Sequence, residues 1–458
     1  MGRTQKRREV NTVFEEQRRY VAGIDLAGHA DHYVCGPRCE DGSPNIRHFG
    51  TTTGELEKML AWLRQEKVVS VAMESTSVYW IPVCDLLESA NIEVVLVDTR
   101  EVHMVPGRKS DVQDCQWLQK LHSCGLLRGA FRPPENICAI RTLIREKASL
   151  VEERSTWIHR MQKSCDQMNI RIHHAVSDMD GVTGLAILHA IANGERDPLK
   201  LAALRDRRCK QSEGEIAEHL RGNWRPEHLF NLGQALLTYE FIAERIRDYE
   251  RQILSLVETE KRQESGKTPG HPDEKKAGAM RRLGEEPMRD ALFQMSGTDL
   301  TVINGIRPET ASVVMSEIGL DFNRFPTEKH FVSYIGLAPK LGKSAGKNVR
   351  QKRRFKNTSR VGAALRMAAS SQRYAQSELG AFFRNVARRQ DAKTAIKATA
   401  RRMAVLIYRL VRYGKAFIDR GSELYEAQFR AKKVRNLKKI VKSLGLSELE
   451  LKTVLGAT

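Results

Sequence analysis

Strand and helix patterns alternate over residues 20–125, and this alternation is the feature that most restricts the fold. Strand-like runs lie at residues 20–27, 31–37 and 46–52, and short apolar runs follow at residues 68–75 and 92–98. Helix-length segments separate the later runs, at residues 52–66 and 78–91. Strands that alternate with helices indicate an α/β layer with a partly parallel sheet.

Three strands in a meander, followed by crossover units, are the strand order of an RNase H-like fold. The sequence therefore predicts an α/β RNase H-like domain over residues 20–130. Thr52 precedes Glu55 by three positions, which is the spacing of a capping box, and it predicts the start of the first helix.

A long amphipathic helix is predicted for residues 134–169. Its apolar positions are Leu150, Trp157, Met161, Cys165 and Met168. Such a stripe can pack on its own domain or on a helix of a second subunit, and both alternatives stay open. The sequence predicts a long helical, coiled-coil-like connector over residues 131–260.

The remaining chain divides by composition. The predicted segments are a basic N-terminal arm at 1–19, a flexible linker rich in Gly, Pro and charge at 261–290, a mainly helical domain at 291–425 and a basic tail at 426–458. Around Gly305 and Pro308 the chain resembles a helix–hairpin–helix. Such a turn can aim backbone N–H groups at a phosphate, or it can simply pack in a core. The last helix of this domain is predicted to end at Gly414.

Net charge limits the partners. Among 458 residues there are 76 Lys and Arg against 56 Asp and Glu, a formal charge of +20 that attracts polyanions. No stretch supplies about 18 uncharged apolar residues, so no membrane partner is predicted. The basic first residues lack the apolar run of a secretory signal. Eight irregularly spaced cysteines indicate reduced thiols and a cytoplasmic protein.

Four carboxylates are candidate metal ligands. Asp25 and Glu74 end two predicted strands, where ligand sites of such sheets lie. Asp111 and Asp114 are three residues apart at the start of a helix and share one face. Oxygen ligands suit Mg²⁺, and two such ions about 4 Å apart stabilise the attacking and leaving oxygens of a phosphodiester. A second, weaker metal pattern consists of His29, His32, Cys35 and Cys39, whose spacing resembles zinc ligands.

A dense cationic segment surrounds a single serine. Residues 343–360 contain eight Lys or Arg and no acid, which is typical of a phosphate-contacting surface. The candidate nucleic-acid-binding residues are Lys343, Lys347, Arg350, Lys352, Arg353, Arg354 and Lys356. Small residues flank Ser344, and no histidine nearby offers a general base. From the residues alone, Ser344 is interpreted as a phosphate hydrogen-bonding group rather than a nucleophile.

Several of these segments together resemble the transposases of the insertion-sequence 110 family. The stretches that carry the resemblance are "VAGIDLAGHADHYV", "VAMESTSVYWIPV", "VPGRKSDVQDCQWLQKLHSCGLL", "GNWRPEHLF", "RFPTEKHFVSYIGLAPK" and "KSAGK". The resemblance implies a RuvC-like domain whose DEDD site maps to Asp25, Glu74, Asp111 and Asp114 and binds Mg²⁺ or Mn²⁺. It also implies a C-terminal transposase domain in which Ser344 is the nucleophile. Ala345 stands where the family motif usually has Gly.

The same resemblance implies the partners. These are donor and target DNA, a structured guide (bridge) RNA, and a homodimer that assembles into a tetramer, in a prokaryotic, nucleoid-associated setting. The predicted function is a site-specific recombinase that excises and inserts its own element. The alternatives are a RuvC-like metal-dependent junction nuclease and a non-catalytic nucleic-acid-binding protein.

Overall fold

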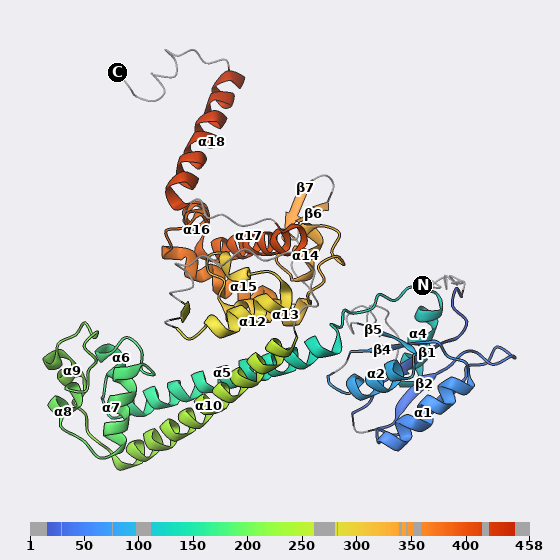
Figure 1. The fold of residues 1–458 in the computed structure, drawn as a ribbon, viewed down its shortest axis with the longest axis horizontal. Helices are drawn as coiled ribbons and strands as arrows, with labels where there is room; N and C mark the ends of the chain where they lie inside the picture. Colours follow the sequence, from blue (N-terminus) through green and yellow to red (C-terminus); the bar gives the residue numbers. More distant parts are fainter. Residues whose placement is uncertain are drawn as a thin grey trace, which may run out of the picture. The chain divides into compact units, whose positions relative to one another are not determined.

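The computed structural model describes residues 16–28, 30–75, 77–97, 111–260, 280–281, 283–338, 341–344, 347–350, 359–414 and 421–444 (Figure 1). The chain divides into two compact units, Met1–Arg132 and Pro133–Thr458. Within the described residues, no helix is both long enough and apolar enough to cross a membrane.

The first unit contains a five-stranded sheet in the order β3-β2-β1-β4-β5. Its strands are β1 (Val21–Asp25), β2 (His32–Cys35), β3 (Ile46–Phe49), β4 (Ser70–Glu74) and β5 (Glu93–Val97). The first three form an antiparallel meander, whereas β4 and β5 run parallel to β1. The predicted mixed α/β arrangement of the N-terminal part is confirmed.

Helices α1 (Thr53–Gln65) and α2 (Trp80–Ser89) pack on one face of this sheet. Ile24 and Met73 point into that core and meet Met59 of α1 and Leu87 of α2, all fully buried. Thr52 is the N-cap of α1, as predicted, but its side chain makes no capping hydrogen bond. The capping-box prediction is therefore wrong, because Glu55 pairs with Lys58 instead, at 2.6 Å.

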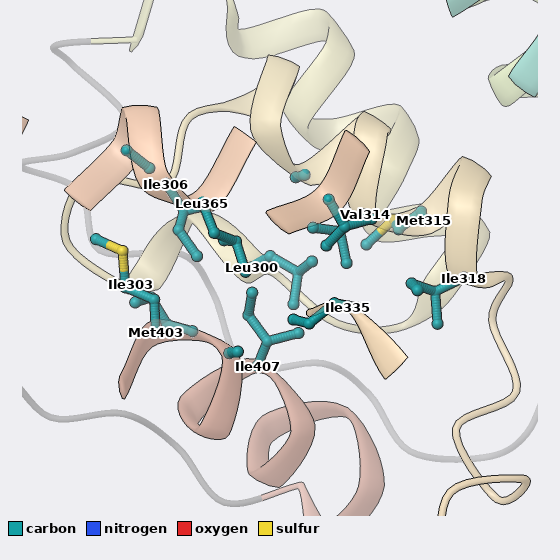
Figure 2. Packing of buried hydrophobic residues seen from close by; sticks show 14 of the residues in the cluster. Leu300, Ile303, Ile306, Val314, Met315, Ile318, Ile335, Leu365, Met403 and Ile407 are labelled. Carbon is teal, nitrogen blue, oxygen red and sulfur yellow. The ribbon is translucent and has the colours of Figure 1, made fainter. Parts of the chain in front are cut away.

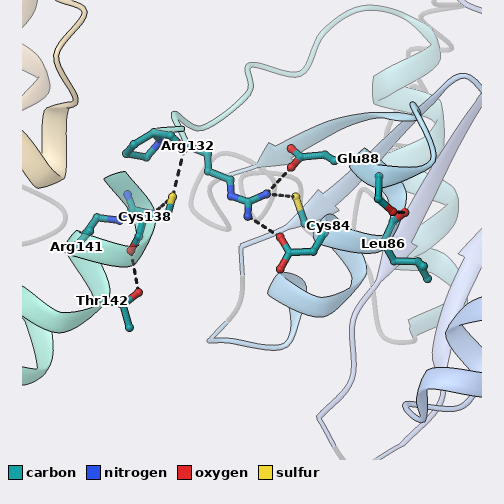
Figure 3. Close-up of polar contacts among 10 residues, drawn as sticks. Cys84, Leu86, Glu88, Arg132, Cys138, Arg141 and Thr142 are labelled. Atoms are coloured by element: carbon teal, nitrogen blue, oxygen red, sulfur yellow. Dashed lines mark hydrogen bonds and ion pairs between the residues drawn. The ribbon is translucent and has the colours of Figure 1, made fainter. Parts of the chain in front are cut away.

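Arg132, the last residue of the first unit, is held to α2 by several polar contacts (Figure 3). Its guanidinium donates to Glu88 at 2.6 Å, to Asp85 at 2.5 Å and to the sulfur of Cys84 at 3.0 Å. The ring of Trp80 lies 5.6 Å from the same group. These contacts fix the end of the first unit on its own helix α2.

The second unit begins with two long helices, α5 (Glu135–Gln167) and α10 (Pro226–Thr259), which lie side by side (Figure 1). Between them in the chain come α6 (Ile172–Ala175), α7 (Val182–Ala192), α8 (Pro198–Ala202) and α9 (Glu213–His219). Met161, Cys165 and Met168 of the predicted apolar stripe are fully buried in the core of this lobe. The stripe therefore packs within its own chain, which is the first of the two predicted alternatives.

The C-terminal part is mostly helical, as predicted. Its elements are α12 (Glu286–Ser296), η1 (Leu300–Val302), α13 (Pro308–Ile318), α14 (Glu328–Tyr334), β6 (Leu341–Ser344), β7 (Lys347–Arg350), α15 (Arg360–Ser370), η2 (Ser371–Tyr374), α16 (Glu378–Arg389), α17 (Ala392–Tyr413) and α18 (Gly421–Ser443). Figure 2 shows Met403 and Ile407 of α17 packed against Leu300 and Ile303 in its core. Helix α17 ends at a left-handed C-cap on Gly414, which confirms that prediction.

The turn that resembles a helix–hairpin–helix lies between η1 and α13. Gly305 has a φ of +88°, which favours glycine. A Cβ there would lie 2.9 Å from the side chain of Met403 and 3.0 Å from the carbonyl oxygen of Ala368. Of the two interpretations offered above, these contacts favour packing in the domain core.

Candidate functional site

The parallel pairing of β1 and β4 brings two of the predicted carboxylates to one edge of the sheet. Their register pairs Gly23 with Ala72 and Ile24 with Met73, so the next positions are Asp25 and Glu74. Each of these residues ends its strand and is half-buried. Because side chains alternate along a strand, Asp25 and Glu74 both point away from the core formed by Ile24 and Met73.

Helix α4 (Asp111–Ser123) covers this opposite face. A Cβ on Gly23 would lie 2.5 Å from the carbonyl oxygen of Cys115, so the backbone of α4 rests directly on β1 at that glycine. At the other end of the helix, Nε2 of His122 lies 2.8 Å from the hydroxyl of Ser70, at the start of β4. Both groups are buried, and burial lowers the pKa of His122 to about 4, so the imidazole is neutral at pH 7.

The first turn of α4 carries the other two predicted carboxylates, Asp111 and Asp114. Burial, together with the negative charges of Asp111, Asp114 and Glu74, raises the pKa of Asp25 to about 7. Three carboxylates, one from β4 and two from α4, therefore act on the single carboxyl group of Asp25. The structure thus gathers all four sequence-predicted carboxylates into one electrostatic cluster.

The chemistry of this cluster suits a hard cation, because its donors are carboxylate oxygens. A cation bound here would offset the like-charge repulsion that, after burial, contributes to the raised pKa of Asp25. However, no group of three His, Cys, Asp or Glu side chains in the described part of the chain is arranged closely enough to hold a metal ion. The donor types fit Mg²⁺, whereas the side chains do not form a closed coordination shell.

The zinc-like pattern in β2 finds no support. His29 lies outside the described residues, and Cys39 is exposed. His32 is buried, and its Nδ1 accepts a hydrogen bond from the N–H of Ala27 at 3.2 Å. Cys35 is three positions further along the same strand, so its side chain lies on the opposite face from that of His32.

The predicted serine lies at the end of strand β6. This strand pairs with β7 in an antiparallel hairpin, with Ser344 opposite Lys347 and Lys343 opposite Asn348. Of the predicted phosphate-binding residues, Lys343, Lys347 and Arg350 belong to these two strands. The others, Lys352, Arg353, Arg354 and Lys356, lie outside the described residues, as does Ala345.

The chain before this cationic segment contacts the chain after it. A Cβ on Gly362, in the first turn of α15, would lie 2.5 Å from the carbonyl oxygen of Ile335. Ile335 follows α14 and precedes the hairpin, whereas Gly362 follows the cationic run. The hydroxyl of Ser359 caps α15 by accepting from the N–H of Gly362 at 3.2 Å. Chain entry and chain exit therefore meet at one packed junction.

Two family models match the chain, one over each candidate site. A transposase model of the IS110 group, named for a DEDD motif, covers residues 22–170. A second model, described as "Transposase IS116/IS110/IS902 family", covers residues 297–384. The chain belongs to the IS110 family of transposases. The first match contains all four carboxylates and the second contains Ser344. A search of curated proteins found no match.

Sequence reasoning missed several residues that shape the site of this family member. Gly23 is needed because α4 rests on it. A Cβ built on Gly28 would lie 2.4 Å from the ring of Tyr79 and 2.6 Å from its hydroxyl oxygen, so a side chain has no room there either. Tyr79 follows β4 and Gly28 follows β1, so the two loops meet beside the carboxylates. The available signal was a glycine close to the Asp at the end of a strand. It could indicate a close contact there, but the residue in contact with the glycine is distant in the sequence.

Proposed function

We propose that this transposase breaks and rejoins DNA through a serine nucleophile, aided by divalent metal bound at Asp25, Glu74, Asp111 and Asp114. The single observation that carries the proposal is the convergence of three negative charges on Asp25, at the carboxyl end of β1. The sheet order β3-β2-β1-β4-β5 is that expected for an RNase H-like, RuvC-like domain and supports the same assignment. Bound Mg²⁺ or Mn²⁺ would supply positive charge to the phosphate that reacts.

Ser344 and the basic residues of the hairpin have separate roles in this reaction. The hydroxyl oxygen of Ser344 attacks the phosphorus, a phosphoserine ester forms, and the bond from phosphorus to one deoxyribose oxygen breaks. The freed sugar hydroxyl of the exchanged strand later attacks the phosphoserine ester and releases Ser344. Lys343, Lys347 and Arg350, on the same hairpin, bind the phosphate backbone together with the following Lys and Arg residues.

The same proposal includes a guide RNA and a tetramer built from dimers. It also includes the domain division of the chain into an arm, a catalytic domain, a coiled-coil-like connector, a linker, a serine domain and a tail. The charge of +20 supports binding of both DNA and RNA. A fragment of duplex DNA that spans the element ends, together with the RNA transcribed beside the gene, is the substrate for the test.

The test is trapping of a covalent protein–DNA adduct on a denaturing gel. The wild-type protein with Mg²⁺ is expected to form the adduct, and Ser344→Ala is expected to bind DNA without forming it. Ser333→Ala, which changes a serine of α14 outside the hairpin, is the control and should behave as wild type. If Ser344→Ala still recombined DNA, the nucleophile would be another group.

Metal-dependent hydrolysis by the same carboxylates is the outcome that would replace this proposal. In that case, cut DNA ends appear without any adduct, and Ser344→Ala cuts as well as wild type. A protein that only binds nucleic acid shows no divalent-cation dependence. Asp25→Asn is expected to abolish adduct formation under the proposed mechanism, with DNA affinity kept within about twofold because Asp25 contributes no phosphate contact.

A further inference from the structure

A pocket of about 300 Å³ lies in the first unit, where helix α4 meets β2 and the connection from β2 to β3. Its polar wall contains two cations, three glutamine amides and an indole, and none of the described residues that line it is acidic. These six residues are Arg38, Gln113, Gln116, Trp117, Gln119 and Lys120. A pocket of this size with a few polar groups directed into it is typical of a small-molecule site.

The pocket is separate from the candidate metal site, although α4 contributes to both. Asp114 and Leu118 are four residues apart and share the face of α4 that meets the sheet, where Leu118 is fully buried. Gln116 and Lys120 are also four residues apart, and they lie on the opposite face of the helix. The carboxylates and the pocket therefore occupy opposite sides of one helix.

Gln119 is the residue that most clearly indicates a ligand. It is only 4% exposed, and its side chain lines the pocket. Its amide makes no hydrogen bond with any residue that the structure describes, and neither does the amide of half-buried Gln116. Because a buried amide without a partner is unfavourable, these two side chains are matched to a molecule that both donates and accepts hydrogen bonds.

The two cations of the pocket are held differently. The guanidinium of Arg38 donates to the carbonyl oxygen of Gly42 at 3.1 Å, which fixes it within the β2–β3 connection. Its Nε also lies 3.4 Å from Glu16 in an exposed pair, which stabilises little and can open. Lys120 has no ion pair within the part of the chain that the structure describes. The pocket therefore presents positive charge to an anionic ligand.

We propose that this pocket binds a single nucleotide, with its phosphate at Arg38 and Lys120 and its base against the Trp117 indole and the glutamine amides. Glutamine amides carry donors and acceptors, as the edges of bases do, and an aromatic ring offers a surface for stacking. The lack of an acidic lining residue disfavours a metal cation. A free nucleotide and an unstacked nucleotide of a single strand present the same base and phosphate, so the experiment has an arm for each.

The first probe is the 5′-monophosphate of 2-aminopurine riboside, whose fluorescence is quenched when its base stacks. The second is a single-stranded oligonucleotide with one central 2-aminopurine. Each is titrated with the full-length protein in EDTA, without other nucleic acid. Quenching of either probe supports the pocket and identifies the source of the nucleotide, whereas quenching of neither overturns the proposal. Adenosine 5′-monophosphate is expected to compete at least tenfold better than ribose 5-phosphate, and equal competition would show that no base is bound.

Two variants assign the binding to this pocket. Lys120→Gln and Gln119→Leu are each expected to weaken binding about tenfold. Gln119→Leu keeps the size of the side chain and removes an unpaired buried amide, so its thermal midpoint should not fall. Arg64→Gln, at an exposed residue of α1, removes the same charge as Lys120→Gln and is the matched control.

Wild-type affinity in both Lys120→Gln and Gln119→Leu would overturn the assignment to this pocket. The inference does not rest on the serine chemistry or on bound metal. Ser344→Ala is therefore expected to bind the probe as wild type does, and a loss of adduct formation in that variant leaves this result unchanged.

Discussion

Gly23 shapes the candidate metal site by having no side chain. The backbone of α4 occupies the space where a Cβ would stand, and this approach carries Asp111 and Asp114 to the end of β1. The pair Ser70–His122 fixes the far end of the same helix. Two contacts outside the carboxylate cluster therefore set which four charges meet.

Gly23→Ala is expected to lower the free energy of unfolding of the first unit by about 2–3 kcal/mol, because α4 must shift away from the sheet. Gly54→Ala is the control. A Cβ at Gly54, in the first turn of α1, meets nothing within 4 Å, so alanine should stabilise slightly. Urea unfolding followed by tryptophan fluorescence measures both, and equal stabilities would contradict the packing described for α4.

Asp25 gives the metal-free protein a pH dependence. Burial and three acidic neighbours raise its pKa from the ordinary value of 3.8 to about 7 in the folded chain. From about pH 4 to about pH 7 the folded chain keeps a proton that the unfolded chain has lost, so stability falls as pH rises through this window.

Asp25→Asn should remove the loss of stability that occurs as the pH rises through this window. Thermal unfolding in EDTA, compared between pH 5 and pH 8, is expected to show a smaller decline in midpoint for Asp25→Asn than for wild type. Glu57→Gln, at an exposed carboxylate of α1, should decline as wild type does. A decline that is the same in Asp25→Asn and wild type would show that Asp25 is ionised throughout.

At the scale of elements, β1 and β4 were predictable from apolar runs, because strands buried on both faces read as continuous apolar segments. Strand β3 has two exposed residues and no such run, and it was predicted as part of the meander. The position of α4 was not predictable, because it depends on Gly23 and on a hydrogen bond that spans 52 residues. The same limit applied to the stripe of Met161, Cys165 and Met168. The spacing of its apolar residues indicated a buried face, but it could not show whether the same chain or a second subunit covers that face.

The junction of α12 and η1 contains a buried ion pair. Arg289 and Asp299 have side chains that are 2% and 10% exposed, and the guanidinium donates to the carboxylate at 2.6 Å and 3.0 Å. Asp299 also accepts from the N–H of Thr301 at 2.9 Å. Asp299→Ala is expected to destabilise the second unit by about 3–5 kcal/mol, because it leaves a buried guanidinium without its carboxylate.

Glu286→Ala provides the comparison on the same helix. Its partner Arg281 is 72% exposed, so loss of this pair should leave the unfolding midpoint unchanged within error. Calorimetry of both variants measures the difference, and an equally small effect of Asp299→Ala would show that Arg289 finds another acceptor or reaches water.

At the scale of the whole molecule, the two units have separate cores. Leu87 is fully buried in the first unit and Ile407 in the second, in clusters that share no residue. Leu87→Ala and Ile407→Ala should each cost about 2–5 kcal/mol. In calorimetry of the intact chain, each is expected to shift a different transition, and a joint shift of one transition would show that the units unfold together.

The meeting of Ile335 and Gly362 has a consequence for how this family can vary. The two scaffold residues that flank the segment are already in contact. The segment can therefore gain, lose or exchange residues without any change in the distance between its two ends. Homologues can therefore diversify the reach and the charge of the Ser344 segment while the helices beneath it stay as they are. For engineering, a replacement segment would be joined at Ile335 and Gly362, the two residues that already lie side by side.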